Sequence, residues 1–166
     1  DEIAKAYREY GCHWNIFPVN RTLESGLPFL PKNPEAILSN HPLDDMILSK
    51  SLSDDEIRTL FTDHYEAPVE RTKIIWDALM NKPIELERAK TAVVDEWAKA
   101  IDTLNPRLVV ISQYDSCFFR RNGMEAPDRE AYDVLSRLKD RFADNHVPLK
   151  SKYIEDKSRW LAFKFE

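Results

Sequence analysis

Residues 82–115, with the sequence KPIELERAKTAVVDEWAKAIDTLNPRLVVISQYD, contain the two strongest structural signals of this chain. Over residues 83–104 the apolar side chains recur every three or four positions, which predicts a long amphipathic helix. Asn105 and Pro106 end this pattern, because proline cannot continue a helix and restricts the residue before it. The run Leu108–Ile111 is apolar and rich in β-branched residues, so it predicts the central strand of a small sheet.

Further helix starts lie on both sides of this stretch. Ser53 and Glu56 form a capping box, in which each side chain satisfies a backbone amide of the first turn. Elsewhere a proline precedes acidic residues, an order that suits the first turn of a helix. Five helices are therefore predicted, at residues 42–51, 53–65, 68–80, 83–104 and 127–144.

Helical spacing also identifies the side chains that should be buried in the two longest helices. They are all apolar, and we expect them to pack around the central strand. In 83–104 they are Leu86, Ala89, Val93, Trp97, Ala100, Ile101 and Leu104, and in 127–144 they are Ala131, Val134, Leu135, Leu138 and Phe142.

The remaining segments complete the predicted fold. Residues 1–10 fit a short helix, residues 12–19 a short strand, and the proline-punctuated residues 20–34 an extended surface arm. Cys117–Phe119 either extends the central strand or turns into a hairpin arm. The stretch 107–154 is long enough for a right-handed βαβ crossover.

The C-terminus predicts a β-hairpin, in which residues 149–154 and 159–165 flank a polar turn. We therefore predict an α+β (or α/β) fold: a helix-rich single domain over 1–166, with a small sheet around strand 107–114 and a C-terminal β-hairpin. A chain that begins at Asp1 is also compatible with a domain excised from a longer protein.

Size and composition narrow the class of protein. The chain has 166 residues and 43% hydrophobic residues, enough for one folded domain and too apolar for disorder. No apolar run approaches the length of a membrane-spanning helix, about 18 residues or more. Cys12 and Cys117 lie far apart without metal-ligand spacing. A single disulfide between them is the alternative, but two buried free thiols and a cytoplasmic location are favoured.

Charge and glycine content bear on the kind of partner. Residues 1–106 carry 12 basic and 19 acidic side chains, whereas residues 107–166 carry 12 basic and 10 acidic ones. Neither part is basic enough for tight nonspecific binding to nucleic acid. Gly11, Gly26 and Gly123 are the only glycines, so the glycine-rich loops of common nucleotide-binding enzymes are absent. No cofactor is therefore expected. No metal is expected either, because the two cysteines lack metal-ligand spacing.

The polar residues after the central strand form the first candidate site. Ligands of open α/β sheets bind beyond the carboxyl ends of the strands, where polar loops and helix starts meet. The alternative is a polar strand end with a buried thiol and exposed arginines. In the functional interpretation Asp115 and Cys117 are catalytic, as base or ligand and as nucleophile, and Gln113, Tyr114, Arg120 and Arg121 bind the ligand, the arginines as an anion clamp.

Two other groups of residues suggest binding. His41 precedes Asp44 and Asp45, and a carboxylate–histidine metal site is conceivable there, but the start of a helix explains both aspartates. In the C-terminal hairpin, cations such as Lys152 alternate with aromatic residues such as Trp160. That surface suits an acidic partner or a single-stranded nucleic acid, or it prevents edge-to-edge aggregation of strands.

Three hypotheses on function follow. The first is a non-enzymatic protein-interaction or regulatory domain with an acidic helical layer and a protein partner, because no strong catalytic signature is visible. The second is a small hydrolase or transferase that uses Asp115, Arg120 and Arg121 at the end of the central strand. The third is nucleic-acid binding through the basic and aromatic C-terminal hairpin. None of the three involves a membrane.

Overall fold

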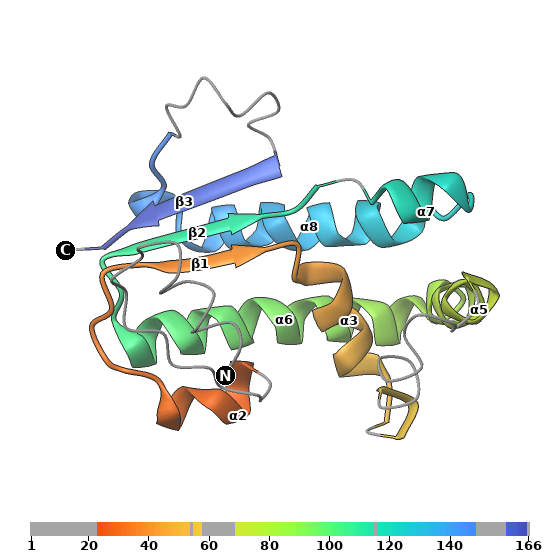
Figure 1. Ribbon diagram of the computed structural model, residues 1–166, viewed down its shortest axis with the longest axis horizontal. Coiled ribbons are helices and arrows are strands. Elements are labelled where there is room, and N and C mark those ends of the chain that lie inside the picture. Colours follow the sequence, from red (N-terminus) through yellow and green to blue (C-terminus); the bar gives the residue numbers. More distant parts are fainter. Residues whose placement is uncertain (1–22, 54, 58–68, 115, 149–158, 166) are drawn as a thin grey trace, which may run out of the picture.

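The fold is built around β2 (Leu108–Ser112), the strand that the sequence predicts (Figure 1). The computed structural model describes residues 23–53, 55–57, 69–114, 116–148 and 159–165. The elements predicted at 1–10, 12–19 and 149–154, and most of 53–65, lie outside the described residues.

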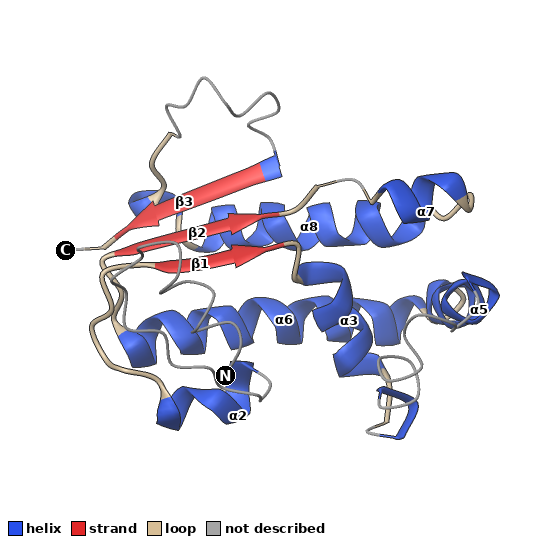
Figure 2. Cartoon of the chain, in the orientation of Figure 1, coloured by secondary structure: helices blue, strands red, loops and turns tan. Residues whose placement is uncertain are grey.

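Three strands form one mixed sheet, with β2 in the middle (Figure 2). β1 (Ile37–Asn40) pairs with β2 in parallel, and β3 (Trp160–Lys164) pairs with it antiparallel. Val109 and Ile111 of β2 are fully buried. The predicted α+β class is thus confirmed, with a small sheet around strand 107–114 and an antiparallel strand pair near the C-terminus.

The helices agree closely with the predicted ranges. α6 (Pro83–Leu104) begins at a proline, and its end cap Asn105 adopts a left-handed conformation with φ of 51°. The capping box of Ser53 is present, because its backbone N–H donates to Glu56 Oε2 at 2.8 Å. The other helical elements are α2 (Leu23–Gly26), η1 (Leu27–Phe29), α3 (Leu43–Ser51), α5 (Val69–Met80), α7 (Cys117–Arg121), α8 (Ala126–Arg141) and η2 (Ala143–Asn145).

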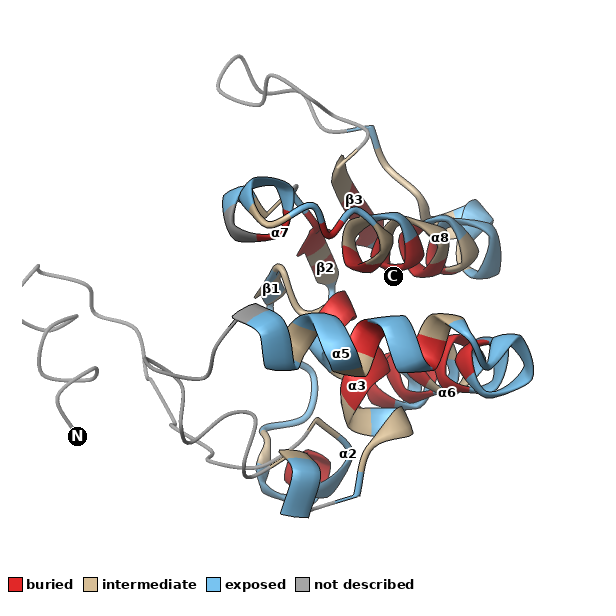
Figure 3. Ribbon diagram, turned by 90° about the vertical axis from the view of Figure 1, so that its right-hand side faces the viewer, coloured by how far each residue is buried: buried red, intermediate tan, exposed pale blue. Residues whose placement is uncertain are grey.

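The predicted buried faces are confirmed. All seven apolar residues predicted for α6 are buried, as are four of the five predicted for α8, and Phe142 is partly buried against the same core. This core joins side chains of α3, α5, α6 and α8 to those of β2 and β3. Figure 3 shows α6 and α8 together on one side of the sheet, with their buried residues turned toward it.

Several predicted details are wrong. Residues 23–29 are helical, not an extended arm. Cys117–Phe119 neither extends the strand nor starts a hairpin arm, because the Ser116 hydroxyl accepts from the Phe119 N–H and caps the helix α7. The parallel neighbour of β2 is β1, and no strand was predicted at residues 37–40. β3 runs antiparallel to β2, and the second strand of the βαβ crossover predicted over 107–154 lies outside the described residues.

A partly buried ion cluster around Lys90 joins α6 to α8. The Lys90 ammonium lies 2.8 Å from Glu130 Oε2 and 2.8 Å from Asp133 Oδ2, and it also contacts Glu87. Lys90 and Glu130 are both buried. Burial disfavours the charged form of Lys90, but its hydrogen bonds to Asp133, Glu130 and Glu87 outweigh this effect and raise its pKa. The lysine therefore stays charged between the helices.

We expect the substitution Lys90→Ala to reduce the free energy of unfolding by about 3–5 kcal/mol, because it removes the buried ammonium that pairs with the buried Glu130 carboxylate. Urea unfolding followed by circular dichroism measures this change. Lys73 serves as the control, because its pair with Asp77 is exposed at 3.0 Å and Lys73→Ala should cost less than about 1 kcal/mol. Equal stabilities of the two variants would contradict a structural role for the cluster.

Candidate functional site

The parallel strands β1 and β2 end side by side, and polar side chains gather there. Asn40, the last residue of β1, lies across from Ser112, and the His41 N–H continues the pairing by donating to the Ser112 carbonyl at 2.7 Å. His41 has a φ of 54°, in the left-handed region that few residues other than glycine adopt. This backbone conformation turns the chain from β1 directly into α3.

Gln113 is fully buried behind this edge, and its side-chain amide is hydrogen-bonded in every direction. Its Oε1 accepts from the Leu43 N–H at 3.2 Å. Its Nε2 lies 3.1 Å from Asp44 Oδ1 and 3.1 Å from His41 Nδ1. Because Nε2 is a donor only, His41 Nδ1 must be the acceptor, and the proton of the neutral ring is on Nε2.

His41 connects the buried amide to the surface. Its Nε2 lies 3.5 Å from Asp44 Oδ1, and its ring stacks on Tyr114 with the centroids 4.2 Å apart. The hydrogen bond with Asp44 raises the pKa of His41. Burial opposes that increase, and the charges of Asp44, Asp128 and Asp45 add to it. The stacked rings of His41 and Tyr114 thus lie together at the carboxyl end of the sheet.

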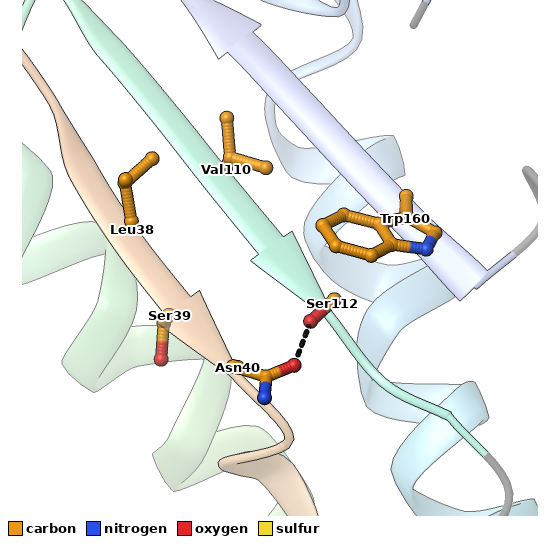
Figure 4. Close-up of a pocket in the computed structure, with 6 residues that line it drawn as sticks. All are labelled: Leu38, Ser39, Asn40, Val110, Ser112 and Trp160. Atoms are coloured by element: carbon orange, nitrogen blue, oxygen red, sulfur yellow. Dashed lines mark hydrogen bonds between the residues drawn. The ribbon is translucent and has the colours of Figure 1, made fainter. Parts of the chain in front are cut away.

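A groove crosses the face of the sheet opposite α6 and α8 (Figure 4). Its volume is about 370 Å³. Leu38, Val110 and Trp160 form its apolar part, and Leu38 is 65% exposed. At the polar end the Ser112 hydroxyl donates to Asn40 Oδ1 at 2.6 Å. This bond orients the Asn40 amide, and no described residue accepts from its exposed Nδ2.

The structure brings some of the predicted site residues together and separates others. Gln113 and Tyr114 lie at the carboxyl end of β2, and the Gln113 N–H donates to the Arg159 carbonyl beside Trp160. Asp115 and Lys152 lie outside the described residues. Arg120 and Arg121 are exposed in the last turn of α7, and Cys117, predicted to be buried, is an exposed free thiol at its start. None of these three residues lines the groove.

Sequence reasoning missed the groove itself. Leu38 and Asn40 belong to a strand that was not predicted, and Val110 was assigned only to the core of the strand. His41 and Asp44 were considered as metal ligands. Among the residues that the structure describes, however, no group of three or more histidine, cysteine, aspartate or glutamate side chains could hold a metal ion. Asp44 instead accepts from Gln113, a partner 69 residues away.

Comparisons with known proteins add no assignment. No protein-family model, no curated protein and no solved structure matches this chain. Within the described part of the chain, no helix combines the length and the apolar character needed to cross a membrane.

We expect His41 to titrate above the ordinary histidine value of about 6.5. The folded state then holds the proton more tightly than the unfolded chain. The resulting stabilisation is present below pH 6.5 and is lost as the pH rises through the folded pKa. NMR titration of the ring measures the midpoint, and the Gln113 side-chain amide should shift with it because a proton on Nδ1 displaces its hydrogen bond.

The variant Asp44→Asn should lower this midpoint, because it removes the carboxylate that favours the charged ring. The matched variant Asp77→Asn changes an exposed carboxylate of α5 and should leave the midpoint unchanged. A midpoint that does not respond to Asp44→Asn would show that this pair does not control His41.

Proposed function

We propose that this chain is a protein-interaction domain that binds a protein partner through the groove face of its sheet. The observation that carries the proposal is that the described helices cover one face of the sheet and leave a groove on the other. α6 and α8 pack on one face, whereas Leu38, Val110 and Trp160 line an open groove on the other. An exposed apolar groove with a polar end is typical of a surface that is completed by a partner.

The arrangement of the polar groups supports a binding function better than a catalytic one. Gln113, His41 and Asp44 are hydrogen-bonded to one another. Among the described residues, none of these groups is paired with a nucleophile that it could activate. Cys117 and the two arginines of α7 do not line the groove. The hydrolase or transferase interpretation therefore has less support.

Nucleic-acid binding also has less support. Asp44, Asp45 and Asp128 contribute negative charge near His41 at this end of the sheet, and phosphate contacts would require cations there. The helices α6 and α8 lie behind the sheet, on the face away from the groove. The proposal includes a cytoplasmic location, which the exposed free thiol of Cys117 supports.

The proposal predicts that the variant Leu38→Lys loses its protein partner. The charged side chain would lie in the apolar groove, and we expect at least about a tenfold loss of retained partner, roughly the effect of one lost buried contact. Affinity capture from native cell extract with quantitative mass spectrometry measures the retained proteins. Trp160→Ala, on the opposite wall of the groove, should deplete the same protein.

Ile84→Lys is the matched control, because Ile84 is 76% exposed on α6, outside the groove. It makes the same chemical change on the helical layer and should retain the partner fully. Circular dichroism checks that all three variants are folded. A captured protein that is retained equally by Leu38→Lys and the wild type does not use the groove, and the proposal would then be wrong.

A further inference from the structure

We propose that the partner docks as an extended peptide strand on the free edge of β1, with an apolar side chain over the groove. This inference rests on the proposed function and specifies the chemistry of the partner. It is carried by three features of the described residues: the direction of the backbone groups of β1, the contrast between the two edges of the sheet, and the size of the surface.

The pairing of β1 leaves alternate backbone groups free. In a parallel ladder every second residue of a strand bonds to its neighbour. The bond from the His41 N–H to the Ser112 carbonyl shows that the odd-numbered residues of β1 face β2. The N–H and C=O groups of Leu38 and Asn40 therefore point to the outer edge, where no described strand pairs with them.

The opposite edge of the sheet is covered. The outward carbonyl of Ala162 in β3 accepts from the Val147 N–H at 2.9 Å, and that of Lys164 accepts from Asn145 Nδ2 at 3.1 Å. His146 also bridges to Phe163. Proteins block exposed strand edges with charges, prolines or covering segments. Ile37–Asn40 contains neither a charge nor a proline that would block its edge. The backbone groups of this edge are therefore suited to pair with an added strand.

The size of the surface favours a linear peptide over a second copy of this chain. Four residues of strand span about 13 Å. A stable dimer buries roughly 800 Å² on each partner, and a strand edge only four residues long is small for such an interface. Short extended peptides, by contrast, bind by adding one strand to a sheet and placing alternate side chains in pockets.

The groove then defines the side chains of the peptide. Side chains directly across from each other in a sheet lie on the same face. The peptide residue beside Leu38 therefore lies over the apolar part of the groove and should be apolar itself. The residue on the same face beside Asn40 lies near the donor Nδ2 and should carry an acceptor, such as an amide or hydroxyl oxygen. Residues between them face away from the groove and are unrestricted.

Amide hydrogen exchange of the free chain, followed residue by residue by NMR, is the first test. The Ser39 and His41 amides, which face β2, should exchange slowly, whereas the Leu38 and Asn40 amides should exchange rapidly. Slow exchange at Leu38 and Asn40 in the free chain would mean that the edge is already occupied, and the proposal would be wrong.

The second test uses peptides. A displayed library of random nine-residue peptides is panned against the full chain, and the selected peptides should carry an apolar residue and an acceptor residue two positions apart. N-methylation of each peptide bond in turn should weaken binding by about tenfold or more at alternate positions only, because every second amide bonds to β1. Binding should also slow the exchange of the Leu38 and Asn40 amides.

Two variants at one position separate backbone from side chain. Leu38→Pro removes the outward N–H but none of the bonds to β2 and should abolish peptide binding, whereas Leu38→Ala keeps the N–H and should only weaken it. Failure to select any peptide would overturn the proposal. If Leu38→Lys and Trp160→Ala block binding but every N-methylated peptide still binds, edge docking is wrong and the groove function stands. Peptides that bind both variants normally would contradict both.

Discussion

The hydrogen bonding of β2 on both of its edges is the constraint on which the rest of the structure depends. The backbone groups of its even-numbered residues bond to β1, and those of its odd-numbered residues bond to β3. The side chains of the odd-numbered Val109 and Ile111 are buried against the helices. A shift of one residue would exchange these side chains with Leu108 and Val110 and expose the core. The same register sets Ser112 beside Asn40 and Trp160, so core packing and groove geometry follow from one alignment.

The helical layer reaches a unique arrangement through buried charges as well as through apolar packing. Lys90 connects α6 to Glu130 and Asp133 of α8. On the same helix the buried Glu96 accepts from the Glu24 N–H and pairs with Lys50 of α3 at 2.8 Å. Apolar side chains tolerate small shifts of one helix against another, whereas a buried ion pair has few acceptable geometries. These pairs therefore hold α3 and α8 in position around α6, and α3 carries Asp44 to the end of the sheet.

The polar side chains at the carboxyl end of the sheet are hydrogen-bonded largely to one another. Gln113 uses both ends of its amide within the protein, and His41 lies between Asp44 and Tyr114. This network links the turn from β1 into α3 to the end of β2. The groove lies on the face of the sheet beside this network. The outer edge of β1 adds backbone hydrogen-bond donors and acceptors next to the apolar part of the groove.

The sequence by itself determined α6, α8, β2 and their buried faces, because helical periodicity, proline starts and a β-branched run are local signals. It also indicated Gln113, Tyr114 and Trp160 as candidate site residues, although it did not predict the groove on the face of the sheet. Only the tertiary structure decided that Ile37–Asn40 is a strand and that β3 returns antiparallel. Ile37–Asn40 has just two apolar residues, and its partner Ser112 lies 72 residues from Asn40 in the sequence. Its strand conformation depends on hydrogen bonds to β2, and contacts between segments so far apart in the sequence leave no local signal.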